Sequence, residues 1–210
     1  YAFLMAYALG QVALGPLIDK LGTRRSFTLA VVWWSVAAML HALGRGFVSF
    51  FALRALLGVT EAVNFPAALK AVAEWFPKHE RSLATGIVTA GTGIGAIVAP
   101  PLIGLLIHFH GWRAAFLVPG AIGFLWVIAW KRWFHPPETP PTITPAERST
   151  ILAGRAAPPN AKLAGRWRDY LRHRETWGLI LARFTGDGAF YFFAFWLPNY
   201  LHSERGFDIV

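Results

Sequence analysis

Six apolar stretches of about 18 residues or more constrain the fold of this chain more than any other feature. They cover residues 1–18, 26–44, 47–76, 83–107, 112–134 and 177–201. A helix of this length crosses a hydrocarbon layer of about 30 Å at about 1.5 Å per residue. Helices are required because a chain in lipid must satisfy its own backbone hydrogen bonds, and the stretches are too long for barrel strands. The sequence therefore predicts an all-α, polytopic membrane protein with six transmembrane helices.

The composition excludes several other classes of protein. With 55% hydrophobic and 15% charged residues, the 210-residue chain is too apolar for an ordinary soluble domain. It has no cysteine, which excludes a disulfide framework, a thiolate metal site and a cysteine nucleophile. The net charge of +9 would favour nucleic acid only on a soluble basic face, and the basic residues lie mainly in the connections instead. We therefore expect a lipid bilayer, and no nucleic acid, as its partner.

Catalytic and metal-binding groups are sparse in the sequence. His108 and His110 stand without a third ligand, which makes a poor metal site. The apolar stretches contain no Ser–His–Asp grouping and no His–Glu ligand set. The sequence therefore predicts neither an enzyme nor a bound metal or other cofactor.

The distribution of Lys and Arg orients the chain. Three basic residues lie in the first connection, two in the third and nine in the fifth, whereas the second, the fourth and the tail carry one each. Basic connections face the cytoplasm. The nine of the fifth connection are Lys131, Arg132 and seven more through Arg174, and residues 135–176 are the one sizeable polar segment, with seven of the 14 prolines. We expect five helices of an N-terminal half (1–134), a basic cytoplasmic linker (135–176) with a short amphipathic segment, and the first helix of a C-terminal half (177–210).

The first connection carries a specific pattern. Residues 15–25 read GPLIDKLGTRR. Gly15 allows close helix approach, Asp19 places a carboxylate at a helix end, and Gly22 permits a tight turn. The pattern resembles the G-x-x-x-D-[RK]-x-G-x-[RK]-[RK] loop of the major facilitator superfamily at every defined position. The alternative is an arbitrary basic turn, which would need neither Gly15 nor Asp19.

The resemblance implies a transporter of which this chain covers the second to seventh helices. Because the chain opens inside an apolar stretch at Tyr1, we expect it to be a fragment. The Asp of the family's loop, here Asp19, is implied to join basic residues such as Arg25 and Arg81 in a charge network that holds one access state closed. The role implied for these three residues is conformational gating.

Two apolar stretches resemble one family within this superfamily. Residues 54–77, RALLGVTEAVNFPAALKAVAEWFP, are similar to the fourth helix of the anion:cation symporter family, particularly its hexuronate and sugar-acid members. Residues 183–201, RFTGDGAFYFFAFWLPNYL, resemble an aromatic, Asp-bearing helix of the same group. These resemblances imply a multi-pass protein of the bacterial inner membrane that carries a small anionic substrate with a coupling proton.

Two charges lie inside the third stretch. Arg54 and Glu61 are seven residues apart, so they differ by only about 20° in azimuth and share a helix face that Asn64 extends. Counted from residue 47, Glu61 lies about 20 Å deep, near the bilayer middle. A charge there costs about 2.5–3.5 kcal/mol on insertion scales, so it must face protein or a water-filled cavity.

This pair of charges suggests coupling chemistry. Arg54 is permanently charged and can bind a carboxylate through two hydrogen bonds. Glu61 can exchange its charge for a proton, because removal from water favours the neutral form of a carboxyl group. Proton uptake by Glu61 would leave Arg54 free to attract an anion, and the loaded state would be close to neutral. The alternative is a structural salt bridge between helices, with no ligand.

Other polar residues extend the predicted site. Asp187, about ten residues into the last stretch, is a second candidate for proton coupling, and the alternative is an i to i+4 pair with Arg183. Lys70 and Glu74 have the same spacing, which favours a structural pair. The neutral candidates for substrate contact are Tyr7, Gln11, Asn64, Thr92, Trp196 and Asn199.

The sequence therefore favours proton-coupled symport of an organic anion, such as a hexuronate or related sugar acid, by alternating access. Transport of another carboxylate or of an aromatic acid is a second interpretation. From a different class, the bundle could belong to a membrane receptor or a membrane-embedded enzyme without transport.

Overall fold

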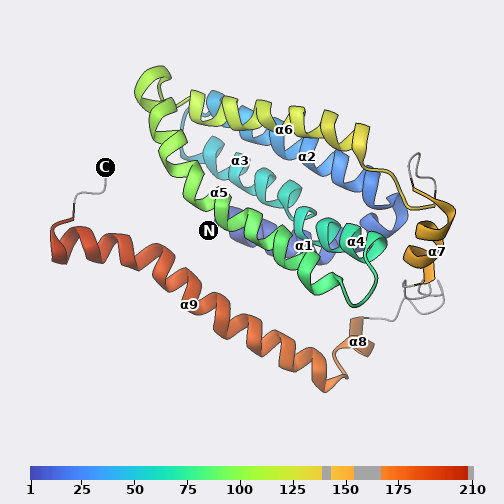
Figure 1. Cartoon of the computed structure of the whole chain (residues 1–210). Helices are drawn as coiled ribbons and strands as arrows, with labels where there is room; N and C mark the ends of the chain where they lie inside the picture. Colours follow the sequence, from blue (N-terminus) through green and yellow to red (C-terminus); the bar gives the residue numbers. More distant parts are fainter. Residues whose placement is uncertain (139–142, 154–166, 208–210) are drawn as a thin grey trace. The chain divides into compact units, whose positions relative to one another are not determined.

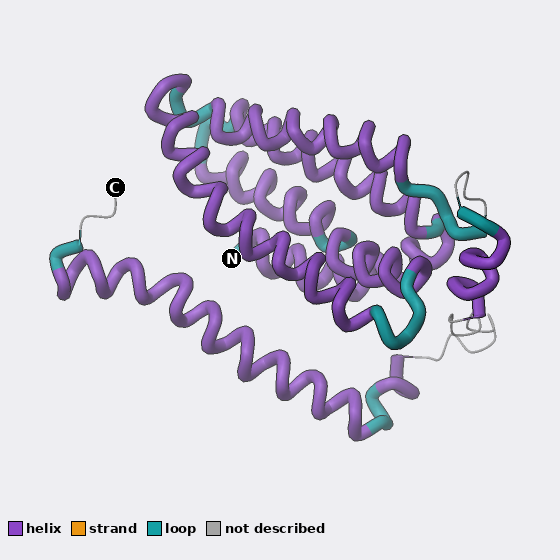
Figure 2. The backbone as a smooth tube through the Cα atoms, viewed as in Figure 1, coloured by secondary structure: helices purple, strands orange, loops and turns teal. Residues whose placement is uncertain are grey.

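The computed structural model of this protein describes residues 1–138, 143–153 and 167–207, which form helices joined by loops (Figure 2). The chain is divided into two units, Tyr1–Arg155 and Ala156–Val210 (Figure 1). The elements in chain order are α1 (Ala2–Leu21), α2 (Thr23–Leu40), the 3₁₀ turn η1 (His41–Leu43), α3 (Phe47–Glu61), α4 (Asn64–Trp75), α5 (Arg81–His110), α6 (Ala114–Trp133), α7 (Pro145–Ala153), α8 (Trp167–Tyr170) and α9 (Arg174–Arg205).

Five helical segments are long and apolar enough to cross a membrane. They are Ala2–Leu21, Thr23–Leu43, Phe47–Trp75, Arg81–His110 and Ala114–Trp133. These segments confirm the predicted all-α, polytopic membrane class and match the first five apolar stretches. The sixth stretch lies in α9, a helix of 32 residues that is not among the five. Charged groups such as Arg183 and Asp187 lower its hydropathy, so a sixth crossing stays a prediction.

The third apolar stretch, predicted as one span over residues 47–76, is interrupted by a turn at residues 62–63, between α3 and α4. Pro66 contributes to the turn. A proline lacks the N–H that would bond to the carbonyl four residues earlier, here that of Ala62, and its ring clashes with that carbonyl. The Ala62 N–H still donates to Gly58 O at 3.1 Å, so the turn continues directly from α3.

Glycines let two pairs of helices approach closely. A Cβ on Gly58 of α3 would collide with the Phe3 carbonyl of α1, and one on Gly10 of α1 would lie 2.8 Å from the Ala62 Cβ, just after α3. A Cβ on Gly120 or Gly123 of α6 would likewise collide with side chains of α2. Small residues at such contacts are typical of membrane bundles, in which helices associate through close packing. The first unit is therefore built on an α1–α3 pair and an α2–α6 pair.

The connection between α1 and α2 is a single residue. Gly22 has φ of 75°, in the left-handed region that favours glycine. Its N–H donates to Ile18 O at 3.0 Å, and its carbonyl accepts from Ser26 Oγ at 2.7 Å. The tight turn predicted at Gly22 is confirmed.

The interior of the first unit is small, and much of its surface is apolar. Many large apolar side chains of the spans are exposed, as expected for helices that face lipid. In the described part of the chain, Ala84 is the only residue of α5 that is buried. The buried apolar cluster, which joins α1, α2, the α3–α4 turn, α4 and α6, consists of Ile18, Phe27, Ala30, Val31, Val63, Ala67 and Val127.

Where it is described, the predicted linker, residues 135–176, contains α7, α8 and the first three residues of α9. α7 lies within it, and the Arg148 guanidinium on α7 donates to the Glu138 carbonyl before it. α8, at the segment expected to be amphipathic, is only four residues long. Residues 139–142 and 154–166 of the linker lie outside the described residues. Its cytoplasmic location stays a prediction.

Candidate functional site

Tyr7 and Gln11 lie on α1 where it packs against α3. A Cβ on Gly58 would meet Tyr7 N at 3.0 Å, and one on Gly10, beside Gln11, would meet the Val59 backbone at 3.4 Å. The earlier residue of α1 contacts the earlier residue of α3, and the later residue contacts the later one, so α1 and α3 run parallel here. Both polar side chains are half-buried. The close contact therefore brings Tyr7 and Gln11 to the depth of the second half of α3.

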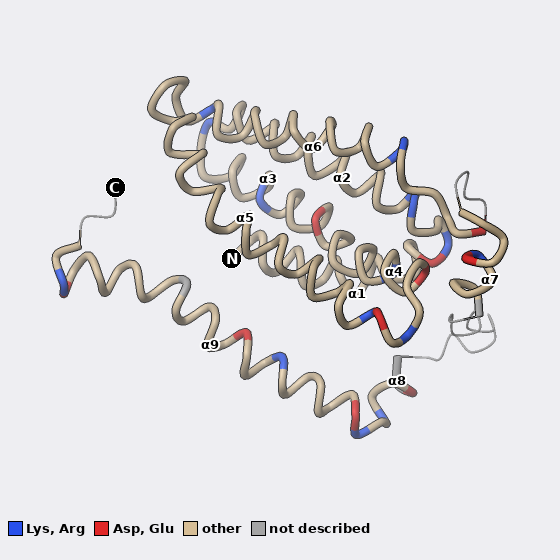
Figure 3. Tube along the Cα trace, viewed as in Figure 1, with Lys and Arg blue, Asp and Glu red and all other residues tan. Residues whose placement is uncertain are grey.

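Arg54 and Glu61 are the charged residues of α3 and lie about one turn before and one turn after Gly58 (Figure 3). Their Cα atoms are about 10 Å apart along the axis, at about 1.5 Å per residue. Arg54 is exposed and Glu61 is half-buried. Within the described residues neither side chain forms a hydrogen bond or an ion pair. The structural salt bridge that the sequence left open is therefore absent from this part of the chain.

The helix break follows Glu61 directly. Glu61 is the last residue of α3, and the half-buried Asn64 is the first of α4. Because Pro66 has no N–H, the carbonyl of Ala62 loses its intrahelical donor. The break therefore places a carboxyl group, an amide side chain and a backbone acceptor within one turn of each other.

The structure does not bring Thr92 close to the polar residues of α1 and α3. It lies on the exposed side of α5, whose main contacts are with its chain neighbours α4 and α6. These contacts do not bring Thr92 to the polar residues of α1 and α3, and its role in substrate contact stays a prediction.

The remaining predicted site residues lie on α9 in the second unit. Asp187 Oδ2 accepts from Arg183 Nε at 2.8 Å, which is the i to i+4 pair that the sequence left open. Trp196 is exposed, and the Asn199 carbonyl accepts from Ser203 Oγ at 2.8 Å. α9 runs unbroken past all three residues. The structure therefore gives Asp187 a partner within its own helix, and its proposed part in proton coupling is untested.

At the predicted cytoplasmic end, Asp19 pairs with Lys70. Lys70 Nζ lies 2.7 Å from Asp19 Oδ1 and 3.3 Å from the Ile18 carbonyl, so one ammonium group binds the end of α1 twice. The spacing of Lys70 and Glu74 favoured a pair within α4, but Lys70 reaches across to α1 instead. Asp19 and Lys70 are 51 residues apart in the chain, so spacing along one helix does not indicate this pair.

A second link joins the same two regions. Thr23 Oγ1, at the start of α2, donates to Glu74 Oε1 at 2.6 Å. Thr23 is buried. Lys70 and Glu74 are one turn apart on α4. Through Asp19 and Thr23, α4 therefore bonds to the residues on both sides of the Gly22 turn. Thr23 escaped the sequence-based prediction, because nothing in the chain marks its hydroxyl as different from that of any other threonine.

The other two residues predicted for gating have different surroundings. Arg81, at the start of α5, donates from Nε to Phe76 O and from Nη2 to Ala73 O, both at 3.0 Å, and so closes the α4–α5 loop. Arg25 is exposed. Among the described residues Asp19 bonds to neither arginine, and the gating role of the three residues stays a prediction.

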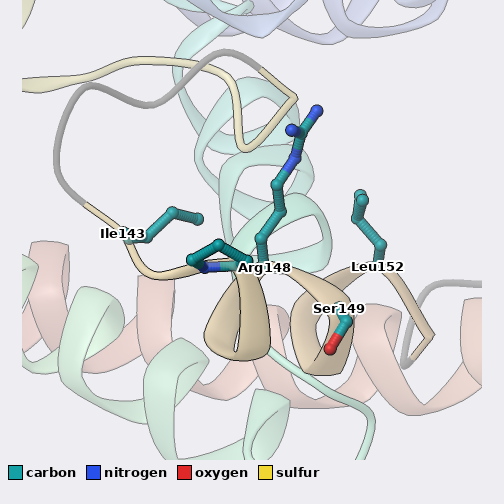
Figure 4. A pocket seen from close by; sticks show the side chains of 5 residues that line it. Ile143, Arg148, Ser149 and Leu152 are labelled. Atoms are coloured by element: carbon teal, nitrogen blue, oxygen red, sulfur yellow. The ribbon is translucent and has the colours of Figure 1, made fainter.

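Of the two best-formed pockets in the described residues, neither lies between the spans of the first unit. One, of about 400 Å³, lies beside α7 and is lined by Ile143, Pro145, Arg148, Ser149 and Leu152 (Figure 4). The other, of about 760 Å³, runs along α9 and includes Arg183 and Asp187 among its lining residues. The described pockets therefore contain Asp187 but none of the predicted site residues of α1 and α3.

The sequence profile of the Major Facilitator Superfamily matches residues 1–210, which is the whole chain. The chain belongs to the Major Facilitator Superfamily. Proteins of this superfamily are transporters and not enzymes. With five apolar spans and bacterial relatives, this chain is a multi-pass protein of the bacterial inner membrane.

Several relatives are similar along almost the entire chain. A hexuronate transporter of Escherichia coli K12 is 35% identical, over 99% of this chain and 49% of the relative. A galacturonate transporter of Dickeya chrysanthemi is 34% identical, over 99% of this chain and 61% of the relative. A probable galactarate/D-glucarate transporter, GudP of Bacillus subtilis 168, is 30% identical, over 100% of this chain and 49% of the relative. The chain thus spans about half of the length of such superfamily relatives.

Proposed function

We propose that the protein to which this chain belongs carries hexuronates or related sugar acids across the membrane together with a proton, by alternating access. The relatives support the substrate class, because each is named for a sugar acid. The observation that carries the proposal is on α3, where a fixed cation and an acid lie two turns apart within a span. Neither has a side-chain partner in the described part of the chain, so both are available to a ligand.

Arg54 is the group proposed to bind the substrate carboxylate. Its guanidinium stays charged at any physiological pH and can hold a carboxylate with two parallel hydrogen bonds. An unpaired charge within a span is costly unless it meets protein, water or a counter-charge. An incoming anion supplies that counter-charge, which gives the empty carrier a physical reason to attract sugar acids and to reject neutral sugars.

Glu61 is the group proposed to bind the proton. As a carboxylate it would compensate the charge of Arg54 when no anion is bound. When it is protonated, Arg54 can accept the substrate, and the loaded pair is close to neutral. A neutral loaded state can reorient across the membrane at lower cost than a charged one. Anion and proton would therefore move in the same direction.

Tyr7, Gln11 and Asn64 are proposed to bind the sugar hydroxyls. A sugar acid presents several hydroxyl groups beside its carboxylate, and hydroxyl and amide side chains can both donate and accept hydrogen bonds. The α1–α3 contact has Tyr7 near Gly58, between Arg54 and Glu61, and Gln11 near the end of α3. The proposed hydroxyl-binding groups therefore lie at a depth similar to that of the proposed anion and proton groups.

We propose that the contacts of α4 with the α1–α2 turn take part in the reorientation of the carrier. Lys70 and Glu74 tie α4 to α1 and α2, and the turn at residues 62–63 separates α4 from α3. A helix broken beside the coupling acid can bend there while its inner half moves with the loop. This arrangement would link the charge state of Glu61 to the opening of the inner end.

Uptake by the full-length protein tests the proposed function. Purified carrier in proteoliposomes is given labelled glucuronate, galacturonate, galactarate or glucose, with and without an inward proton gradient. We expect the gradient to drive accumulation of at least one sugar acid and not of glucose, and competition among the acids to identify the preferred one. Accumulation of none of the acids, or equal accumulation of glucose, would exclude this function.

A further inference from the structure

Four basic residues meet at one end of the α2–α6 pair. Arg24 and Arg25 begin α2, and Lys131 and Arg132 lie in the last turn of α6, as Figure 3 shows for Lys and Arg. The Arg24 guanidinium donates to the Lys131 carbonyl, and Trp130 Nε1 donates to the Arg24 carbonyl at 3.3 Å. The two helix ends are therefore held together, and we call the four cationic residues the α2–α6 basic patch.

No carboxylate neutralises this patch within the part of the chain that the structure describes. Arg25, Lys131 and Arg132 are exposed and form no ion pair there. The acids of the same end are engaged elsewhere, Asp19 with Lys70 and Glu74 with Thr23. Three side chains with a full positive charge thus remain open on one side of the bundle.

The patch also lies at the ends of two candidate spans, where lipid headgroups are expected. The span Thr23–Leu43 begins at the patch, and the span Ala114–Trp133 ends there. Trp133, next to Arg132, is 77% exposed, and tryptophan is enriched at the boundary between lipid and water. Basic residues at this boundary attract anionic phospholipids, and Arg can bind a phosphate oxygen pair in bidentate fashion.

We propose that the α2–α6 basic patch is a binding site for the headgroup of an anionic phospholipid. Arg24 fixes the spacing of the two helix ends, while Arg25, Lys131 and Arg132 contact the phosphate and the negatively charged headgroup. Trp133 packs beside the upper acyl chain. This site is separate from the proposed substrate site on α1 and α3 and does not depend on transport.

Lipid binding to the full-length protein tests the site. The protein in neutral detergent is titrated with phosphatidylglycerol or phosphatidylcholine, and bound lipid is counted by native mass spectrometry. We expect a preference for phosphatidylglycerol. Because a basic residue near an anionic membrane surface contributes about fivefold in affinity, the triple variant Arg25→Gln/Lys131→Gln/Arg132→Gln should lose this binding on the order of a hundredfold.

Two variants separate a site from general charge. Lys78→Gln/Arg172→Gln/Arg174→Gln removes three exposed basic residues outside the patch and should change binding by less than about threefold, well below the effect of one patch cation. Arg25→Lys/Lys131→Arg/Arg132→Lys keeps the charge and should retain the preference. Arg24 is left unchanged in all variants, because it holds α2 to α6. Equal losses in both neutralised triple variants, no loss in the patch variant, or no preference in the wild type would each overturn the proposal.

Discussion

At the scale of single residues, the charged pair of α3 shows what spacing along one helix can predict. Their seven-residue spacing alone places Arg54 and Glu61 on one helix face, and the structure keeps them apart, with neither paired in the described residues. The partner of Lys70 was predicted wrongly, because spacing along one helix cannot show which neighbouring helix end lies closer. Distances between elements decide such pairs.

Gly58 carries a prediction at this scale. A Cβ at position 58 would collide with the Phe3 backbone, so Gly58→Ala must push α1 away from α3. Overpacking of this kind costs about 1–3 kcal/mol. We expect the thermal midpoint of the purified full-length protein to fall by several degrees and uptake to fall with it.

Gly46→Ala is the matched control. Nothing lies within 4 Å of its Cβ position, and its φ of 175° is extended backbone that any residue adopts. Its midpoint should equal that of the wild type. A Gly58→Ala protein as stable as Gly46→Ala would show that α1 and α3 are not in close contact.

At the scale of elements, the length of each apolar stretch predicted the helices well, but not the break between α3 and α4. A proline by itself does not predict a helix break, since Pro16 and Pro119 lie inside unbroken helices. The break at Pro66 depends on how α3 and α4 pack on their neighbours, which a single sequence does not reveal. α7 was missed for a related reason, because a short polar helix carries no strong apolar period.

Pro66→Ala tests the break. Alanine restores the N–H that the Ala62 carbonyl lacks, so α3 and α4 should become continuous. We expect slower hydrogen exchange in the peptide around residues 62–66 and a lower rate of transport, because the bend between the halves is lost. Pro16→Ala should leave exchange at residues 62–66 unchanged. If Pro66→Ala transports as fast as the wild type, bending at this turn is not part of the cycle.

The pair of Asp19 and Lys70 gives a second prediction for the elements. Asp19→Asn and Lys70→Gln each remove the ion pair that joins α1 to α4 at 2.7 Å and should slow transport several-fold. The exchange Asp19→Lys/Lys70→Asp restores an ion pair and should recover part of the rate. Lys20→Gln, an exposed neighbour of Asp19, is the control. An exchanged pair no faster than either single variant would argue against a direct contact.

At the scale of the whole molecule, apolar length and basic loops were enough to predict a bundle of a known superfamily, and the profile match confirms it. The number of spans was harder, because α9 is long enough to cross but carries Arg183 and Asp187 near its middle. Hydropathy weighs each residue alone. It cannot register that these two charges pair with each other, which lowers the cost of placing them in lipid.

Labelling of introduced cysteines tests whether α9 crosses. The chain has no cysteine of its own, so a full-length protein freed of other cysteines can carry one at position 203. In intact cells we expect an impermeant maleimide to label Ser203→Cys and Gly46→Cys from outside, but not Lys78→Cys. Protection of Ser203→Cys together with labelling of Gly46→Cys would place the end of α9 on the inner side.

The account depends most on Glu61 as the residue that couples the proton to the anion. Its most direct test is the sugar-acid transport of full-length Glu61→Gln in proteoliposomes, measured once as accumulation under an inward proton gradient and once as exchange without a gradient. Glutamine keeps the size and polarity of the side chain but cannot release a proton. We predict that accumulation is abolished while exchange continues, and that Arg54→Ala loses both. Accumulation by Glu61→Gln at the wild-type level would contradict the proposed mechanism.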